Sequence, residues 1–321
     1  MSEPEEATHN AKVISFINMK GGVGKTTLTK EIGFRLSNSL NKEVLLIDVD
    51  PQINLTQSVF KHFNYAQSEE IAQKLKKQYN DDNSDTKDNN SDTKDQAVNS
   101  NTTKVSTASI KKVFESSVSG PASPEECILT FPNTSLSIIP GELGIEFITR
   151  NLNSTQLENG IYNFISAHKL RSKFDYILID CPPTYSSYTV AALKPSDFYV
   201  VPVKPEAYSI LGINMLNKVV EAITSDNFIF FEKRPLKNLG IILTDIKSKP
   251  STGIKNIIQD ISSSKVLKNQ QIGIFNTTFL HNQYLQNDIG YFIDNSNAEK
   301  GSKPNLNKLV KEFEKRINGH E

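Results

Sequence analysis

The chain has 321 residues, 36 basic and 36 acidic side chains, 37% apolar residues, two cysteines and no tryptophan. This length supports a full core, and the zero net charge gives no global attraction to nucleic acid or anionic lipid. The two cysteines, Cys127 and Cys181, are too few for a disulfide framework or a four-ligand zinc site. The polar N-terminal residues do not resemble a secretion signal, and no apolar run is long enough for a membrane span. We therefore expect a cytoplasmic protein.

Six short apolar runs predict β-strands, and several are apolar on both faces, which is typical of a buried parallel sheet. Between the first two, residues 26–40 place leucine and isoleucine on one helical stripe, and the other strands are far enough apart for crossover helices. We therefore expect one α/β domain over residues 1–321, with a doubly wound, mostly parallel sheet and helices on both faces. The runs are 13–17, 44–47, 136–139, 176–179, 198–201 and 239–243.

One segment interrupts this pattern, at about residues 66–109. It contains no Leu, Ile or Phe between Leu75 and Ile110, and the hexapeptide Asn-Ser-Asp-Thr-Lys-Asp at 83–88 is repeated at 90–95. Such a segment buries too little apolar surface to offset the entropy of ordering it. We expect a disordered, low-complexity insertion or a long surface loop, and an interaction tether is the alternative.

A glycine-rich loop follows the first predicted strand directly and opens the first predicted helix. Its glycines let successive backbone N–H groups point at phosphate oxygens, the second lysine supplies a charge, and the threonine after it can bind Mg²⁺. The common phosphate-loop pattern has glycine at the position of Met19, and this chain has a lysine after it instead. The pattern predicts a nucleotide site formed by Lys20, Gly21, Gly22, Val23, Gly24, Lys25, Thr26 and Thr27.

Three further motifs follow the carboxyl ends of later strands. They are Asp-Val-Asp-Pro-Gln-Ile-Asn-Leu-Thr at 48–56, Ile-Asp-Cys-Pro-Pro at 179–183 and Pro-Val-Lys-Pro-Glu at 202–206. With the glycine-rich loop, their order resembles the ParA/MinD superfamily of P-loop ATPases with a deviant Walker A box. The Pro-Gln and Cys-Pro-Pro elements are typical of ParA rather than MinD. The resemblance covers about residues 12–58 and 110–317.

The resemblance implies Mg²⁺-dependent ATP hydrolysis and assigns the residues around the phosphates. Lys25 and Thr26 hold the phosphates and the metal, and Asp180 holds the metal through a water molecule. Asp48 lies close to the metal, and Asp50 orients the attacking water. Carboxylates at a phosphate site without a cation repel the ligand, which is why ATP and Mg²⁺ are expected together.

The resemblance also assigns Lys20, which in the family reaches across a nucleotide-sandwich dimer to the phosphates of the partner subunit. A cation supplied in this way stabilises transition-state charge and couples hydrolysis to a homodimer in the ATP state. The catalytic set is then Lys20, Lys25 and Asp50. For the base, the resemblance points to Asp245, after the strand at 239–243, and to Leu280.

A basic region near the C-terminus points to nucleic acid. Residues 232–321 carry 14 basic and nine acidic side chains, and Lys247, Lys249 and Lys255 cluster after the strand at 239–243. Lys249 falls where similar ParA proteins carry a DNA-contacting arginine. Phosphate contacts need only charge, so we expect non-specific DNA binding, with an ordinary solvated loop as the alternative. A second basic position of relatives is occupied by histidine and tyrosine, at 281 and 284.

The last predicted helix bears on a membrane alternative. Glu312 and Glu314 interrupt its polar face, whereas interfacial anchors are strongly basic, so we expect a helix that packs on the sheet and no membrane binding. Its apolar stripe is formed by Leu306, Leu309, Val310, Phe313 and Ile317.

About 12 residues precede the first strand, too few for a helix-turn-helix domain. The resemblance is therefore to the small ParA type, a nucleoid-associated partition ATPase for plasmid or chromosome. In that type a separate ParB-like centromere-binding protein stimulates hydrolysis and releases the dimer from DNA. The alternative is a MinD-like or other positioning ATPase that acts on a membrane or protein cargo.

Overall fold

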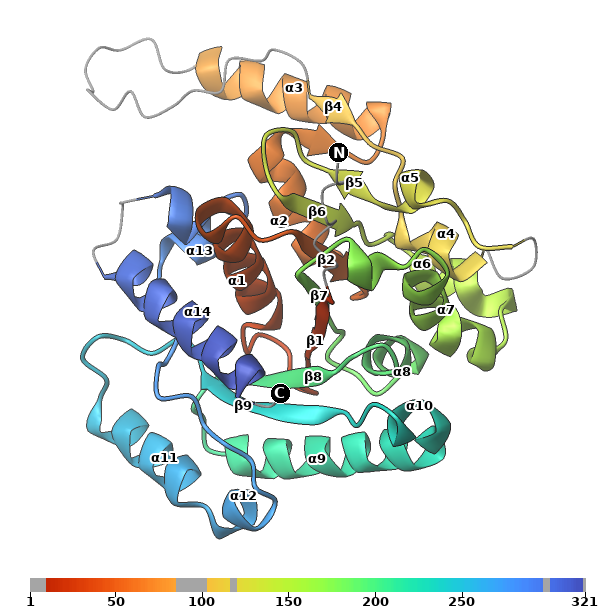
Figure 1. Ribbon diagram of the computed structural model, residues 1–321. Helices are drawn as coiled ribbons and strands as arrows, with labels where there is room; N and C mark the ends of the chain where they lie inside the picture. Colours follow the sequence, from red (N-terminus) through yellow and green to blue (C-terminus); the bar gives the residue numbers. More distant parts are fainter. Residues whose placement is uncertain (1–9, 85–102, 116–119, 297–300, 320–321) are drawn as a thin grey trace, which may run out of the picture.

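The structure is a computed structural model that describes residues 10–84, 103–115, 120–296 and 301–319. Within these ranges seven strands form one sheet, in which all neighbours run parallel except the edge strand β5 (Leu129–Thr130) (Figure 1). The predicted doubly wound, mostly parallel sheet is confirmed, and so are the six predicted strands. In sheet order after β5 the strands are β6 (Leu136–Ile139), β2 (Val44–Asp48), β7 (Tyr176–Asp180), β1 (Lys12–Phe16), β8 (Phe198–Val203) and β9 (Lys237–Leu243).

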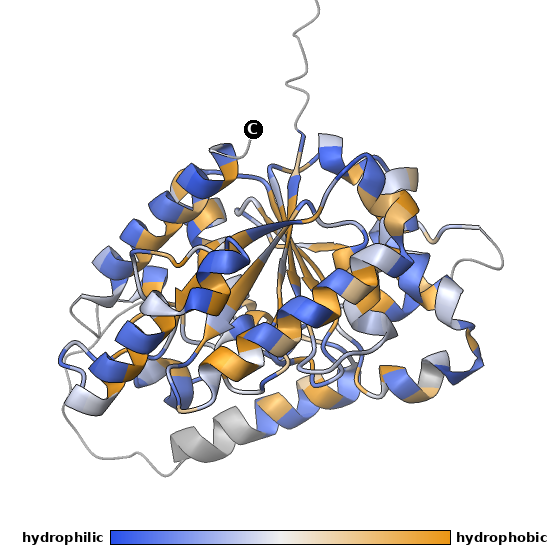
Figure 2. Cartoon of the chain, turned by 90° about the horizontal axis from the view of Figure 1, so that it is seen from below, coloured by the Kyte–Doolittle hydropathy of each residue, from blue (hydrophilic) through white to orange (hydrophobic). Residues whose placement is uncertain are grey.

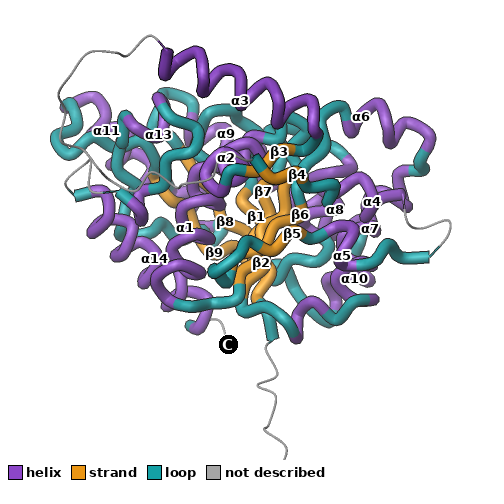
Figure 3. Tube along the Cα trace, turned by 90° about the horizontal axis from the view of Figure 1, so that it is seen from above, coloured by secondary structure: helices purple, strands orange, loops and turns teal. Residues whose placement is uncertain are grey.

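Alternate residues of the central strands face opposite sides and belong to two separate apolar clusters. Val13 and Leu45 lie in one cluster, and Ile14 and Leu46 lie in the other. Because both faces are apolar, helices cover both of them. Figure 2 shows hydrophobic strands surrounded by helices with hydrophilic outer sides, and Figure 3 shows the strands between two groups of helices.

The helix predicted over residues 26–40 is confirmed as α1 (Lys25–Leu40), which packs on the same face as α2 (Asn54–Phe63) and α14 (Ser302–Asn318). The opposite face is covered mainly by α7 (Ser154–Ala167), α8 (Ser187–Leu193) and α9 (Ser209–Asp226). Other helices are α4 (Ile110–Glu115), α5 (Pro124–Cys127), α6 (Ile145–Ile148), α10 (Phe228–Glu232), α11 (Thr252–Ser263), α12 (Lys265–Asn269) and α13 (Tyr284–Asn287), with 3₁₀ turns η1 (Thr149–Asn151), η2 (Leu170–Ser172) and η3 (Ile293–Asn295).

The C-terminal helix α14 closes the core, as its apolar stripe predicts. The five residues of that stripe are all buried, and the ring of Phe313 stacks on that of Phe16 at 6.3 Å between centroids. This stripe is used inside the protein, against the sheet. In the part of the chain that the structure describes, no helix is long and apolar enough to cross a membrane.

The segment at about 66–109, expected to be a disordered insertion or a long surface loop, contains a helix and a short strand near its two ends. After β3 (Tyr65–Ala66) comes α3 (Glu69–Ser84), and β4 (Lys104–Val105) pairs with β3 in parallel. The beginning of α3 is rich in Glu, Lys, Gln and Leu, which favour a helix even with few apolar contacts. The remainder, residues 85–102, lies outside the described residues.

Candidate functional site

All four motifs meet at the carboxyl edge of the sheet. The register places Asp180 of β7 beside Phe16 of β1 and beside Asp48 of β2, so the ends of these three strands are neighbours. A cleft of about 520 Å³ opens at this edge, within the size range of small-molecule sites. It is lined by residues 21–27 of the glycine-rich loop, by Asp50, and by residues that follow β9.

The glycine-rich loop has the backbone geometry of a phosphate cradle. Gly22 and Gly24 have positive φ values of 71° and 92°, which only glycine adopts without strain, and Gly24 caps α1. The hydroxyl of Thr244 donates to the carbonyl of Val23 at 2.7 Å and fixes the loop to the end of β9. Lys25 is buried, and its ammonium donates to the carbonyls of Asn18 and Lys20 at 3.1 and 3.2 Å.

Burial lowers the pKa of Lys25, and the nearby Asp180 opposes this shift. The charged form of Lys25 is therefore disfavoured by burial, and a negatively charged partner would stabilise it. The loop carbonyls supply only partial charges, so anionic phosphate oxygens are better acceptors for this lysine.

Thr26 and Asp180 form the part of the site that fits a magnesium ion. The Thr26 hydroxyl donates to Oδ2 of Asp180 at 2.6 Å, while Oδ1 of Asp180 is buried with no hydrogen-bond partner. Burial, and next the charge of Asp48, raise the pKa of Asp180 well above its ordinary value, and a divalent cation reverses this balance. A hydroxyl and a carboxylate beside a phosphate cradle are ligands that Mg²⁺ accepts, together with water and phosphate oxygens.

The described residues hold no group of three or more His, Cys, Asp or Glu side chains arranged around an ion. Both cysteines are buried thiols, and Cys127 is the last residue of α5.

Asp48 and Asp50 have different surroundings, although both belong to the same motif. Asp48 is fully buried, and its Oδ2 accepts from the N–H and the hydroxyl of Thr56 at 2.9 and 2.7 Å, so it holds the first turn of α2. Burial raises its pKa to about 7. Asp50 lines the cleft and accepts from the N–H of Gln52 at 3.0 Å. Between them and α2, Ile53 has a φ of 50°, a strained conformation for a β-branched residue.

Lys20 does not line the cleft. Its ammonium pairs with the carboxylate of Glu206, and its side chain is 52% exposed. Glu206 belongs to the Pro-Val-Lys-Pro-Glu motif after β8, and its N–H donates to the hydroxyl of Ser209 at the start of α9. The structure thus brings two of the motifs into contact, but it directs Lys20 away from the phosphate cradle of its own chain.

Asp245 and Leu280, the two residues that the sequence predicts for the base, both line the cleft. Asp245 accepts from the ammonium of Lys204 at 2.7 Å and from Nδ1 of His281 at 2.6 Å. Burial alone raises the pKa of Asp245, but these two hydrogen bonds outweigh it and lower the pKa. Asp245 has a positive φ of 59°, which aspartate tolerates better than most residues.

Sequence reasoning missed several residues that line the cleft. Lys30 lies four residues after Thr26 and therefore on the same face of α1, a signal that helical spacing alone provides. Ser58 of α2, and Leu285, Gln286 and Ile289 around α13, carry no recognisable motif.

The three lysines considered for DNA lie outside the cleft. Lys247 and Lys249 are exposed on the loop after β9, and Lys255 is exposed on α11. Their positions are compatible with a surface contact of any anionic polymer and do not distinguish it from a solvated loop.

Comparisons with known proteins bear on the family of this chain. A family model described as an AAA domain matches residues 11–231. The chain is 25% identical to the virulence plasmid ParA family protein of Chlamydia psittaci over 261 residues, 81% of this chain and 80% of that protein. It is 24% identical to the sporulation initiation inhibitor protein Soj of Bacillus subtilis over 255 residues, 78% of each.

Among solved structures, the fold is similar to that of a Cyanothece McdA variant in complex with ATP, with a TM-score of 0.67 and 18% identity over 97% of each chain. The family model covers more than half of the chain, and the relatives align along most of its length. Together with the four motifs at one sheet edge, these matches lead to one conclusion: the chain belongs to the ParA family of P-loop ATPases.

Proposed function

We propose that the protein is an ATP-dependent DNA partition ATPase that acts as a nucleotide-dependent dimer. The observation that carries this proposal is the cleft at the strand ends, where Lys25 and the Thr26–Asp180 pair flank the glycine-rich loop and Asp50 lines the same space. Membership of the ParA family and the resemblance to a plasmid ParA protein and to Soj support a role in partition.

Each residue of the cleft has a separate task in this proposal. Mg²⁺, held by Thr26 and through water by Asp180, neutralises charge on the phosphates when it is bound. Lys25 exchanges its two loop carbonyls for phosphate oxygens. Asp50 accepts a hydrogen bond from the attacking water and orients it. Asp48 contributes indirectly, because its hydrogen bonds to α2 keep the segment that carries Asp50 in place.

Lys20 is the residue that links hydrolysis to dimerisation in this proposal. Its side chain is half exposed, and its ammonium pairs with Glu206 in the single chain. An exposed ion pair of this kind is weak, so the phosphates of a second subunit can compete for the lysine. Dimerisation then completes both sites with a cation supplied from the partner.

The exposed Lys247, Lys249 and Lys255 support the DNA-binding part of the proposal. Contacts of lysine with DNA phosphates are independent of sequence and weaken steeply with salt. In this scheme the ATP dimer binds bulk DNA, and a separate ParB-like protein bound to the cargo stimulates hydrolysis and releases it. The protein would then act in the cytoplasm, on the nucleoid.

The test is retention on non-specific duplex DNA with ATP, with ADP and without nucleotide, over a salt series, together with mass from light scattering. We expect retention of a dimer with ATP only, lost at high salt. The double variant Lys247→Ala, Lys249→Ala is expected to lose retention. A matched double variant on α12, Lys265→Ala with Lys268→Ala, removes the same charge from exposed positions and is expected to keep it.

Two results would contradict this proposal in different ways. A dimer that forms with ATP but ignores DNA would indicate a positioning ATPase with a protein or membrane cargo. Equal losses in both double variants would show that retention depends on total charge and not on the loop after β9.

A further inference from the structure

Part of the cleft is lined by a segment that we call the outer wall, residues 284–294. Leu285, Gln286 and Ile289 of this segment line the same cleft as the glycine-rich loop. The wall lies between α1 and α2 in space, although it is more than 200 residues away from them in sequence. Both helices begin at the phosphate end of the cleft, one at Lys25 and the other just after Asp50.

Helix α2 holds the wall through two backbone carbonyls. The hydroxyl of Ser58 donates to the carbonyl of Ile289, and Nδ1 of His62 donates to the carbonyl of Gly290 at 3.1 Å. Ser58 is 3% exposed, and its hydrogen bond to Ile289 is part-buried. The bond from Ser58 therefore fixes the backbone of Ile289, which is one of the residues that line the cleft.

Helix α1 holds the next carbonyl. The ammonium of Lys30 donates to the carbonyl of Tyr291 at 2.8 Å and lies 4.6 Å from the centre of the Phe292 ring. Oε2 of Glu31 accepts from the N–H of Ile293 at 3.0 Å. The Lys30 and Glu31 side chains are 6% and 0% exposed, so this pair is buried between helix and wall.

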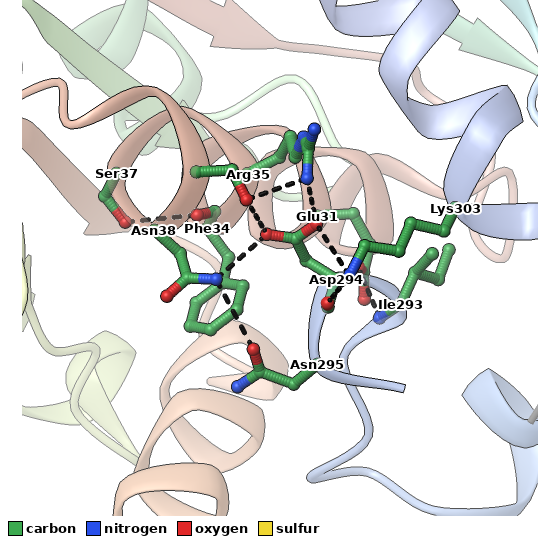
Figure 4. Close-up of polar contacts among 10 residues, drawn as sticks. Glu31, Phe34, Arg35, Ser37, Asn38, Ile293, Asp294, Asn295 and Lys303 are labelled. Atoms are coloured by element: carbon green, nitrogen blue, oxygen red, sulfur yellow. Dashed lines mark hydrogen bonds and ion pairs between the residues drawn. The ribbon is translucent and has the colours of Figure 1, made fainter. Parts of the chain in front are cut away.

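The last residue of the outer wall, Asp294, accepts hydrogen bonds from three side chains of α1. Figure 4 shows the Asp294 carboxylate facing α1, where it accepts from Arg35, Asn38 and Ser39. The ring of Phe292 fills the space between the helices, 4.5 Å from the Phe34 ring and 4.3 Å from the His62 ring between centroids.

Three consecutive carbonyls of the wall therefore each accept from a side chain of α1 or α2. The donors Lys30 and Ser58 are buried, so moving the wall away would leave both the donors and these part-buried carbonyls without partners, and the wall therefore follows the two helices that supply the donors. The glycine-rich loop and the Asp50 segment lead directly into these helices. The position of the wall is consequently tied to the phosphate end of the cleft.

We propose that Lys30 and Ser58 are positioning residues that hold Leu285 and Ile289 of the outer wall against the base of the bound nucleotide. They act through the backbone of the wall. They therefore affect the contribution of the base and the ribose to ATP affinity, and not the contribution of the phosphates. This inference rests on the proposed function, because it takes ATP as the ligand.

The experiment is calorimetric titration with Mg²⁺–ATP and, separately, with Mg²⁺–tripolyphosphate, which has the phosphates but no base. In Lys30→Met and in Ser58→Ala we expect ATP affinity to fall about tenfold, the size of one lost hydrogen bond to a buried group, while tripolyphosphate affinity stays within about twofold. Ser58→Ala removes a single oxygen, so it keeps the test valid if Lys30→Met fails to fold.

Lys61→Met is the matched control. Lys61 is on the same helix as Ser58 and also contacts the wall, through Asp288 at 2.9 Å, but both side chains are more than half exposed. An exposed pair contributes little, so neither affinity is expected to change.

The outcomes separate this inference from the proposed function. Equal loss of both ligands in Lys30→Met and Ser58→Ala, or no loss of either, overturns the positioning role while ATP binding stands. A parent protein that binds tripolyphosphate as tightly as ATP also overturns it, because base contacts then contribute nothing. A parent protein that binds neither ligand contradicts the proposed function itself, and the positioning role with it.

Discussion

The two ends of the cleft are built in different ways. At the proposed phosphate end, the residues come from short motifs at the carboxyl ends of β1, β2 and β7, such as Lys25, Asp50 and Asp180. At the proposed base end, Asp245 follows β9, while the outer wall is held by side chains of α1 and α2 from the other half of the chain. The phosphate end thus depends on strand order, whereas the base end depends on packing between distant segments.

The largest expected effect is at the phosphate end. Asp50→Asn removes the carboxylate that is proposed to orient the attacking water, and we expect ATP hydrolysis to fall about 1000-fold, within the range for a positioned acid–base group. ATP binding is expected to remain, because Asp50 does not hold the phosphates. Steady-state phosphate release and ATP titration measure the two quantities. Turnover close to that of the parent protein would remove Asp50 from this role.

The next largest effect is expected for Lys25→Ala, which is also at the proposed phosphate end. We expect the affinity for Mg²⁺–ATP to fall about 100-fold, and the affinity for Mg²⁺–tripolyphosphate to fall equally, because the lost contacts are to phosphate. Titration calorimetry measures both. Lys42→Ala, just beyond the opposite end of α1, is the control and should bind both ligands normally. If Lys25→Ala lowered the affinity for ATP but not that for tripolyphosphate, Lys25 would not act through the phosphates and the proposed difference between the two ends would be wrong.

The buried Glu31 gives the base end a pH dependence. Burial raises its pKa from 4.5 to about 7, against the opposing effect of Lys30. The folded protein therefore binds this proton more tightly than the unfolded chain, so the stabilisation is full below pH 4.5 and is lost as the pH rises through 7. Gln at this position keeps an acceptor for the N–H of Ile293 but has no proton to lose.

We expect the stability of Glu31→Gln, relative to the parent protein, to improve by about 2 kcal/mol between pH 5 and pH 8. Chemical unfolding at the two pH values measures this difference. The comparison is made between variant and parent, because Asp48 and Asp180 also have raised pKa values and titrate in both proteins. A difference in stability that is independent of pH would show that Glu31 does not change its charge in this range.

The smallest effect is expected at Asp245. Asp245→Asn weakens the hydrogen bonds from Lys204 and His281, and we expect about a fivefold loss of ATP affinity with tripolyphosphate binding unchanged, because one partly exposed polar contact is weakened. A competition titration of ATP against tripolyphosphate measures this fivefold difference in ATP affinity. A loss shared by both ligands would place Asp245 at the phosphate end instead.

The sequence locates the motifs that meet at the cleft because each motif is contiguous and stands at the end of a strand. The glycine-rich loop is recognisable from eight successive residues, and the apolar stripe of α14 from helical spacing alone. The assignment of Asp48 is less complete, since its hydrogen bonds to Thr56 give it a role in holding α2 that no spacing reveals. The order of α3 and β4 was also missed, because a single backbone pairing with β3 needs few apolar residues.

The sequence by itself determined the set of parallel strands, the glycine-rich loop and the carboxylates at the ends of β2 and β7, because local periodicity and contiguous motifs carry that information. Only the tertiary structure decided that Lys20 pairs with Glu206 and that Lys30 and Ser58 hold the outer wall. These contacts join residues about 190 to 260 positions apart in the chain. No local pattern encodes such a pairing, since it arises only when the sheet has brought the helices together.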